Sequence, residues 1–237
     1  MRIGLPRALL YYRYGRFWEC FLKGLGAEVV VSRKTDESLL NKGVGCVSSE
    51  VCLPIKIVAG HLLELAGEVD AIFFPRIVWM QEKLYACPKM IGIVDIARML
   101  IGDRVRLIAP AIKGNFVTAH LIAGLKINPN PIVVWQAFQQ AKKKLSESRS
   151  QKHAPSDQTR IGHFGRQGGA EGPKQVGLIG HFYNIQEDFI SRAIIETFKE
   201  NGYQIITKEE LPQNVLLNKK GFASKIRWVY ERELYNA

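Results

Sequence analysis

The sequence lacks the hallmarks of membrane and secreted proteins. No apolar run approaches the roughly 18 residues that a membrane-spanning helix needs, and the N-terminus MRIGLPRALLYYRYGR has no apolar segment followed by a small-residue cleavage site. Four cysteines in 237 residues are too few for a disulfide-dense secreted scaffold. These absences predict a cytoplasmic protein, with no membrane partner, whose thiols stay reduced.

Several common catalytic and nucleotide-binding motifs are also missing. The sequence has no Walker lysine motif, no GxSxG and no HExxH, and GLIGHFYN (177–184) departs from the GxGxxG dinucleotide fingerprint. No CxxC pair occurs, so spacing alone does not decide the role of the cysteines. They are either buried small hydrophobes or metal ligands.

What the sequence does contain is enough apolar material for a core and a surplus of positive charge. Hydrophobic residues make up 47% and charged residues 23% of the chain, which is typical of a globular protein. The net charge is +11, but the segment 142–174 alone holds eight Lys or Arg against three acids, a surplus of +5. Such a run is typical of a solvated tether, and this concentration of charge argues against the alternative, a nucleic-acid-binding arm.

The first half of the chain alternates short β-branched runs with helix-like stretches. This rhythm predicts an α/β fold of two Rossmann-like, flavodoxin-like three-layer units with a parallel sheet, the second unit being incomplete. Thr35 is the expected N-cap of a helix that begins with Asp36 and Glu37. The expected strands are 2–5, 27–32, 71–75 and 106–110, and the other expected helices are 7–25, 54–65, 91–100, 115–125 and 131–145.

Composition divides the chain into three parts. Residues 1–145 are the expected N-terminal Rossmann-like domain, and residues 146–173 are a basic, flexible linker rich in Ser, Gln and Gly. Residues 174–237 begin a second Rossmann-like domain. Its expected elements are a strand at 175–180, a helix at 186–201 and a strand at 203–207, followed by a tail with room for one or two short helices.

Cys52 lies where a thiol becomes reactive. In SSEVCLPIKIVAGHLLEL (48–65) it stands just before a helix that we expect to start at Pro54, and free N–H groups at a helix N-terminus lower the pKa of a thiol. Lys56 and His61 lie on the same helix. Each of the three also has a structural interpretation, as a buried small residue, a solvated side chain and a hydrogen-bonded histidine at the helix edge.

Cys87 repeats this arrangement in KLYACPKMIGI, after a strand and before a helix. Turns that follow neighbouring strands of a parallel sheet meet at its carboxyl edge, where open α/β folds bind ligands. The two cysteines are therefore expected at one site with the geometry of a metal centre, and the proline beside each turn stiffens the loop.

The sequence resembles a known family at these residues. IGLPRALLYY, FWECFLKGLGAEVVVS, SEVCLPIKIVAGH, AIFFPRIV and YACP are similar to the N-terminal domain of the 2-hydroxyacyl-CoA dehydratase and benzoyl-CoA reductase family. The nearest branches are the dehydratase D-component, the double-cubane cluster proteins and the activase-associated proteins. GHFYNIQEDFISRAIIETFKENGYQIITKEELP is similar to the start of that family's second domain.

The resemblance implies an iron–sulfur protein with a role in ATP-activated, low-potential electron transfer and acyl-CoA dehydration or reduction. It implies a 4Fe–4S or double-cubane cluster, an ATP-dependent activator protein, an acyl-CoA ligand, and a partner subunit or a homodimer. Cys52 and Cys87 match two cluster ligands. The resemblance further implies cofactor contacts by Glu50, Lys56, His61, His181 and Tyr183.

Three departures from the family pattern limit this expectation. No cysteine follows Cys87, so Cys46 is the candidate third ligand, although its place in an expected strand favours a buried non-ligand, and Cys20 is expected to pack within a helix. The turn expected as Gly-Arg-Pro-Tyr reads GHFY (180–183), and family members continue for about another hundred residues. The chain alone is therefore expected to be inactive, and the alternative is a truncated, cluster-free remnant with an interaction or structural role.

Overall fold

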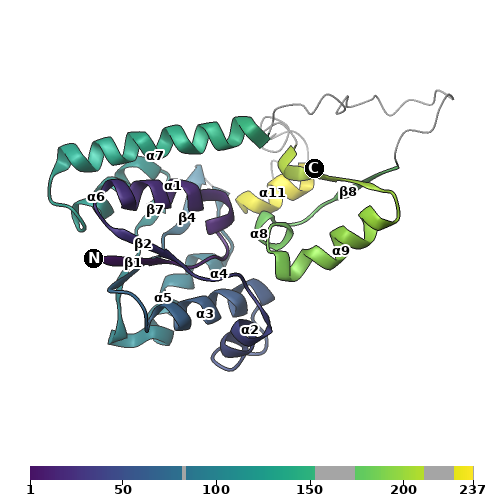
Figure 1. Ribbon diagram of the computed structural model, residues 1–237, viewed down its shortest axis with the longest axis horizontal. Helices are drawn as coiled ribbons and strands as arrows, with labels where there is room; N and C mark the ends of the chain where they lie inside the picture. Colours follow the sequence, from purple (N-terminus) through teal and green to yellow (C-terminus); the bar gives the residue numbers. More distant parts are fainter. Residues whose placement is uncertain (82–83, 153–173, 211–226, 237) are drawn as a thin grey trace.

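The computed structural model describes residues 1–81, 84–152, 174–210 and 227–236 (Figure 1). These residues form a mixed α/β structure built on a parallel sheet, which confirms the fold class expected from the sequence. Within the described part of the chain, no helix is both long and apolar enough to cross a membrane.

The principal sheet has four parallel strands in the order β2-β1-β3-β6. Ile3 of the central strand β1 lies opposite Val29 on one side and Ala71 on the other. Covered on both faces, the central strands are almost wholly apolar, as parallel sheets require. The strands are β1 (Arg2–Leu5), β2 (Glu28–Val31), β3 (Ala71–Phe73) and β6 (Arg106–Ile108).

A second, three-stranded sheet in the order β5-β4-β7 extends the first, and it was not expected from the sequence. Its strands β4 and β7 follow β3 and β6 closely in the chain, after Pro75 and Pro110, and pair in parallel. The proline at which each expected strand ends interrupts the ladder, and pairing then resumes beyond it. The strands are β4 (Arg76–Gln81), β5 (Leu84–Tyr85) and β7 (Ala111–Lys113).

Helices cover both faces of the principal sheet (Figure 1). One layer consists of α1 (Tyr11–Gly24), α6 (Phe116–Leu125) and α7 (Pro131–Lys152). The opposite layer consists of α2 (Glu37–Val44), α3 (Leu53–Leu65), α4 (Pro88–Ile91), α5 (Ile93–Ile101) and the 3₁₀ turn η1 (Gly102–Arg104).

An aromatic core fills the space between the first helix layer and the sheet. Phe17 and Phe21 stack with ring centroids 5.9 Å apart, and Phe73 contributes from β3. The Trp18 indole donates a 3.0 Å hydrogen bond to His120 Nε2, so this buried histidine is satisfied inside the core. Burial of so many large rings makes this layer the main source of stability.

The C-terminal elements form one parallel βαβ unit, as expected. Strands β8 (Gln175–Leu178) and β9 (Gln204–Thr207) pair in parallel, joined through α8 (Phe182–Ile185) and α9 (Asp188–Glu200). The 3₁₀ turn η2 (Lys208–Glu210) and helix α11 (Val229–Asn236) follow. The predicted division into two domains stays a prediction.

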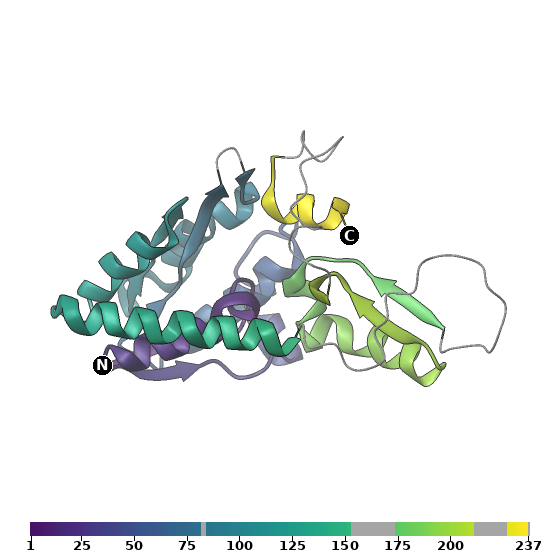
Figure 2. The ribbon, with the colours of Figure 1, turned by 90° about the horizontal axis from the view of Figure 1, so that it is seen from above.

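Helix α11 returns to the N-terminal half, where it lies between the β4–β5 hairpin and α8 (Figure 2). The Tyr85 N–H donates a 2.7 Å hydrogen bond to the Arg227 carbonyl, and Tyr85 also forms a parallel bridge with Trp228. The residues just before α11 thus pair with β5 in the first half of the chain.

Several expected boundaries were wrong for local reasons. The first helix begins at Tyr11 rather than residue 7, after a turn in which Leu9 adopts a φ of 51°. Asp36, not Thr35, is the N-cap of α2, because its carboxylate accepts from the Leu39 N–H at 2.9 Å. Helix α7 continues past the expected end at 145 to Lys152, and the rest of the expected linker, 153–173, lies outside the described residues.

The expected strand at Cys46 was also wrong. Residues 43–46 end α2 and turn away from it, so Cys46 is exposed rather than buried. Gly43 in that run serves helix packing instead, because a Cβ on it would lie 1.9 Å from the Lys56 carbonyl oxygen, just as a Cβ on Gly60 of α3 would lie 2.2 Å from that of Leu39. Only glycine allows α2 and α3 to approach this closely.

Candidate functional site

Two cysteines occupy matching positions at the starts of helices. Cys52 is the N-cap of α3 with φ −65° and ψ 152°, and Cys87 is the N-cap of α4 with φ −63° and ψ 152°. Each helix has a proline in its first turn, which fixes the backbone where the thiol is presented. Cys52 is exposed and Cys87 is half-buried, so both thiols are within reach of solvent.

The two cysteine loops touch each other. The Lys89 ammonium donates to the Glu50 carbonyl oxygen at 3.3 Å, which links the turn after Cys87 to the turn before Cys52. The Lys56 ammonium donates to the Ser49 carbonyl oxygen at 2.9 Å and braces its own loop. In this structure Glu50 and Lys56, which the resemblance marks as cofactor contacts, shape the loops that carry the thiols.

Tyr183 connects both cysteines to the C-terminal half. It lies in the first turn of α8 and is buried, with 9% of its surface exposed. Burial is the main cause that raises its pKa, followed by the negative charge of the Cys87 and Cys52 thiolates and then of Glu231. The charges of both cysteines therefore act on the phenol of Tyr183, which comes from a third part of the chain.

His181 lies beside Tyr183 as the N-cap of α8. The two rings stack with centroids 5.0 Å apart and planes 14° apart. Burial lowers the pKa of His181, and the neighbouring Lys208 lowers it further. Its Nδ1 is buried and has no hydrogen-bond partner among the described residues. A buried ring nitrogen without a partner is costly, so this atom marks a place where a polar group would be stabilised.

The structure places His61 in the core. The ring is fully buried, with Nδ1 2.8 Å from Ser32 Oγ and Nε2 3.1 Å from Thr35 Oγ1. Burial lowers the pKa of His61 to about 3, and the positive charges of Arg7 and Arg33 act in the same direction. Both nitrogens are already engaged, so the expected cofactor contact has no free nitrogen to use and the alternative structural interpretation fits the geometry.

The remaining cysteines do not join the pair. The described residues include no group of three His, Cys, Asp or Glu side chains that could hold a metal ion, so Cys46 does not complete a three-ligand site with Cys52 and Cys87. Cys20 lies half-buried in α1, and burial raises the pKa of its thiol. It is a packing residue, as its position in the middle of a helix suggested.

A buried ionic cluster, absent from the sequence-based expectations, holds the C-terminal elements beside the cysteines. The Arg13 guanidinium binds the Glu233 carboxylate through two hydrogen bonds of 2.9 and 2.8 Å and lies 4.2 Å from the centre of the Phe182 ring. Lys208 adds a buried 2.9 Å contact to the same carboxylate. Next to it, the Tyr12 hydroxyl donates to Glu187 at 2.6 Å. No local motif signals these pairs, because their partners are far apart in the sequence.

A comparison with known families identifies the family of this chain. The model of a family described as the CoA enzyme activase uncharacterised domain matches residues 2–211. The chain belongs to this family. This membership links the chain to the activase-associated branch of the family that the sequence resembles. It also links the chain to the CoA-dependent dehydratase system. No curated protein and no solved structure shows a significant match.

Chemically, the candidate site offers two thiols on linked loops and a stacked pair of a protonated phenol and an imidazole. Thiolates at the N-termini of helices bind soft metals and act as nucleophiles, because the free N–H groups and the helix dipole favour negative charge. The geometry of this CoA enzyme activase domain therefore suits soft-metal binding or thiol chemistry at the junction of the two halves.

Proposed function

We propose that Cys52 and Cys87 supply two thiolate ligands to an iron–sulfur cluster, and that this domain serves low-potential electron transfer in a CoA-dependent dehydratase or reductase system. The observation that carries the proposal is the hydrogen bond from Lys89 to the Glu50 carbonyl oxygen, which joins the two cysteine loops. The two cysteines also cap their helices with matching backbone geometry, as expected of ligands to a single centre.

The described residues fit part of such a ligand set. Two N-cap thiols provide sulfur donors, and the unpartnered Nδ1 of His181 lacks a hydrogen bond that a further polar group would supply. The described residues do not supply a third ligand group, so in this proposal the remaining ligands come from a second copy of the chain in a homodimer.

When bound, the cluster would supply one-electron chemistry at low potential. The chain's own residues would hold and shield it. Proline in the first turns of α3 and α4 keeps the two thiols in place, and Tyr183 with the stacked ring of His181 would shield the cluster at the start of α8. An ATP-dependent activator protein would donate the electron to the cluster. The substrate of the system would be an acyl-CoA.

The test is anaerobic reconstitution of the full chain with iron and sulfide, followed by measurement of bound iron and visible absorption. We expect the wild type to retain iron and the Cys52→Ser/Cys87→Ser variant to lose most of it. The matched control is Cys20→Ser/Cys46→Ser, which removes the same number of thiols and should retain iron at the wild-type level.

Two outcomes would contradict the proposal. Absence of bound iron in the wild type would favour the cluster-free interaction or structural role. Equal loss of iron in both double variants would mean that the cysteines bind iron without forming a site.

A further inference from the structure

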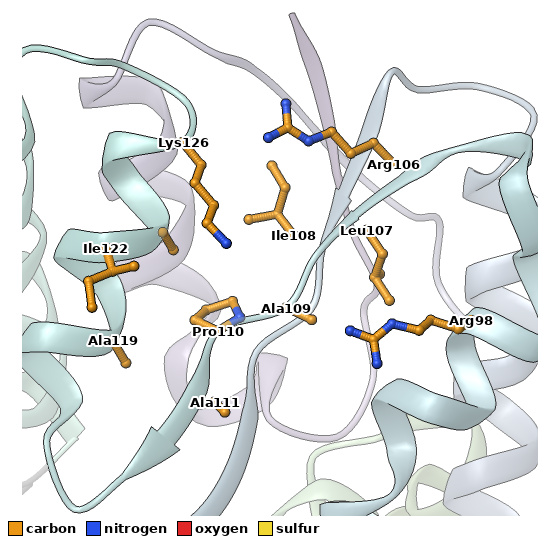
Figure 3. A pocket seen from close by; sticks show the side chains of 11 residues that line it. Arg98, Arg106, Leu107, Ile108, Ala109, Pro110, Ala111, Ala119, Ile122 and Lys126 are labelled. Atoms are coloured by element: carbon orange, nitrogen blue, oxygen red, sulfur yellow. The ribbon is translucent and has the colours of Figure 1, made fainter.

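A cationic pocket lies at the edge of the principal sheet, and its lining includes no residue of the cysteine site (Figure 3). Its volume is about 380 Å³. Strand β6 and the segment after it form the floor, α5 borders one side and α6 the other. Three cationic side chains surround the pocket, namely Arg98, Arg106 and Lys126.

Two of these three charges lack an acidic partner among the described residues. Arg98 is paired with Asp95 at 2.9 Å, and the same carboxylate also contacts Arg76. Arg106 and Lys126 make no ion pair within the described part of the chain, and their side chains approach Ile108 from two sides (Figure 3). The pocket thus presents about two uncompensated positive charges.

The rest of the lining is apolar. Ile108 and Pro110 lie on the floor, and Ala119 and Ile122 of α6 form a wall. Ile122 is 55% exposed, although a large aliphatic side chain gains free energy when it is covered. Charge beside an apolar wall suits a ligand that has an anionic group and an apolar body.

A polypeptide strand is a poor occupant for this edge. β6 is the terminal strand of its sheet, so its outer edge has no neighbouring strand among the described residues. It is only three residues long, it is followed by Pro110, and Arg106 stands at its start. Short length, proline and charge are the features by which edge strands avoid pairing. A compact molecule fits this pocket better than an added strand.

We propose that this pocket binds a small organic phosphate monoester. A phosphate monoester carries about −1.5 to −2 charges at neutral pH, which matches the free charges of Arg106 and Lys126. A guanidinium binds phosphate through two parallel hydrogen bonds, and an ammonium adds a point charge. The organic part would lie against Ala119 and Ile122.

The test is titration calorimetry of the full chain with AMP, adenosine and inorganic phosphate. We expect AMP to bind at least about tenfold more tightly than either of the other two probes, because only AMP uses both the cations and the apolar wall. Arg106→Gln/Lys126→Gln should lose about tenfold or more in AMP affinity. The control Lys142→Gln/Lys143→Gln removes the same charge from the exposed face of α7 and should bind AMP as the wild type does.

A third variant separates the cavity from its charge. Ala119→Leu keeps every cation but fills part of the pocket, so it should weaken AMP binding while leaving the weak binding of inorganic phosphate unchanged. An unchanged melting temperature would show that each variant is folded.

The proposal is overturned if AMP does not bind at about 1 mM, if adenosine binds as tightly as AMP, or if the two charge variants lose affinity equally. The last result would mean that AMP responds to net charge alone. None of these outcomes depends on iron binding, so the cysteine site is tested separately.

Discussion

The N-terminal and C-terminal halves of the described chain are each stabilised in a different way. In the N-terminal half, Phe17, Phe21 and Phe73 are 0–1% exposed and belong to one continuous apolar core. In the C-terminal half, Ser191 is the only fully buried residue of α9, while Phe189 and Ile194 are 41% and 50% exposed. The first half carries its own core, whereas the second is stabilised largely by its contacts with the first.

Those contacts combine apolar packing of Phe182 and Tyr230 with polar and charged pairs. Arg13–Glu233, Tyr12–Glu187 and Lys34–Asp188 all join the halves. Apolar packing tolerates small shifts, but a buried ion pair stabilises only while both partners are present and aligned. The position of α8, which carries Tyr183, therefore depends on the attachment made by Arg13.

Loss of core packing should have the largest effect. Phe21→Ala empties a fully buried position that contacts Phe17 and Phe138, and we expect it to lower the free energy of unfolding by about 3–5 kcal/mol in urea titrations. Phe189→Ala removes the same side chain from the exposed face of α9 and should change the free energy of unfolding by less than about 1 kcal/mol. Similar losses for the two variants would show that the halves do not differ in this way.

Breaking the buried ionic cluster should come second. Glu233→Ala leaves Arg13 and buried Lys208 without their shared carboxylate, which should cost about 3 kcal/mol. The effect should be local, so amide hydrogen exchange is the measurement, with faster exchange in α11 and little change in β1 and β3.

The exposed pair between the halves provides the control. Lys34 and Asp188 have side chains 67% and 50% exposed, and solvent screens their attraction. Lys34→Gln should therefore lower the free energy of local opening of α11, as measured by hydrogen exchange, by less than about 1 kcal/mol. Exchange in α11 that responds to Lys34→Gln as strongly as to Glu233→Ala would contradict the central role of the buried cluster.

Acidification should give a smaller effect, on the N-terminal half. The pKa of His61 is lowered to about 3 in the fold, below the ordinary value of 6.5, so the unfolded chain takes up the proton first. The stabilisation is complete above pH 6.5 and is lost as pH falls towards 3. Between pH 7 and 5 this loss should be about 2 kcal/mol.

Urea unfolding at several pH values measures this dependence. His61→Asn should reduce the slope between pH 7 and 5, whatever its effect on stability at neutral pH. His120, whose pKa burial lowers to about 4, contributes equally to both proteins, so it cancels in the comparison. An unchanged slope would show that His61 is not held neutral.

The layered fold was largely predictable from local patterns. Apolar runs predicted β1, β3, β6 and β9, and Asn115 was correctly taken to start α6, where its side chain accepts from the Thr118 N–H at 2.9 Å. The strands β4, β5 and β7 were missed, because short strands beside proline become recognisable only when a partner strand is present. Cys46 was misplaced because glycines that serve close helix packing look the same in sequence as those in a strand.

The candidate site was predictable in kind but not in detail. Proline shortly after Cys52 and Cys87 indicated two stiff helix starts, and the structure has both. The sequence did not indicate that Tyr183 is buried in α8, or that His61 is enclosed by Ser32 and Thr35. Those contacts depend on how distant segments pack, which periodicity does not report.

The sequence by itself determined most of the helices and the strands of the principal sheet, and where Cys52 and Cys87 begin their helices, because propensity, capping and hydrophobic spacing act between near neighbours. Only the tertiary structure decided that Arg13 meets Glu233, that Arg106 and Lys126 share one pocket, and that Cys46 stays apart from the cysteine pair. Charges and thiols have no periodic signature, and their partners are chosen by the geometry of the folded chain.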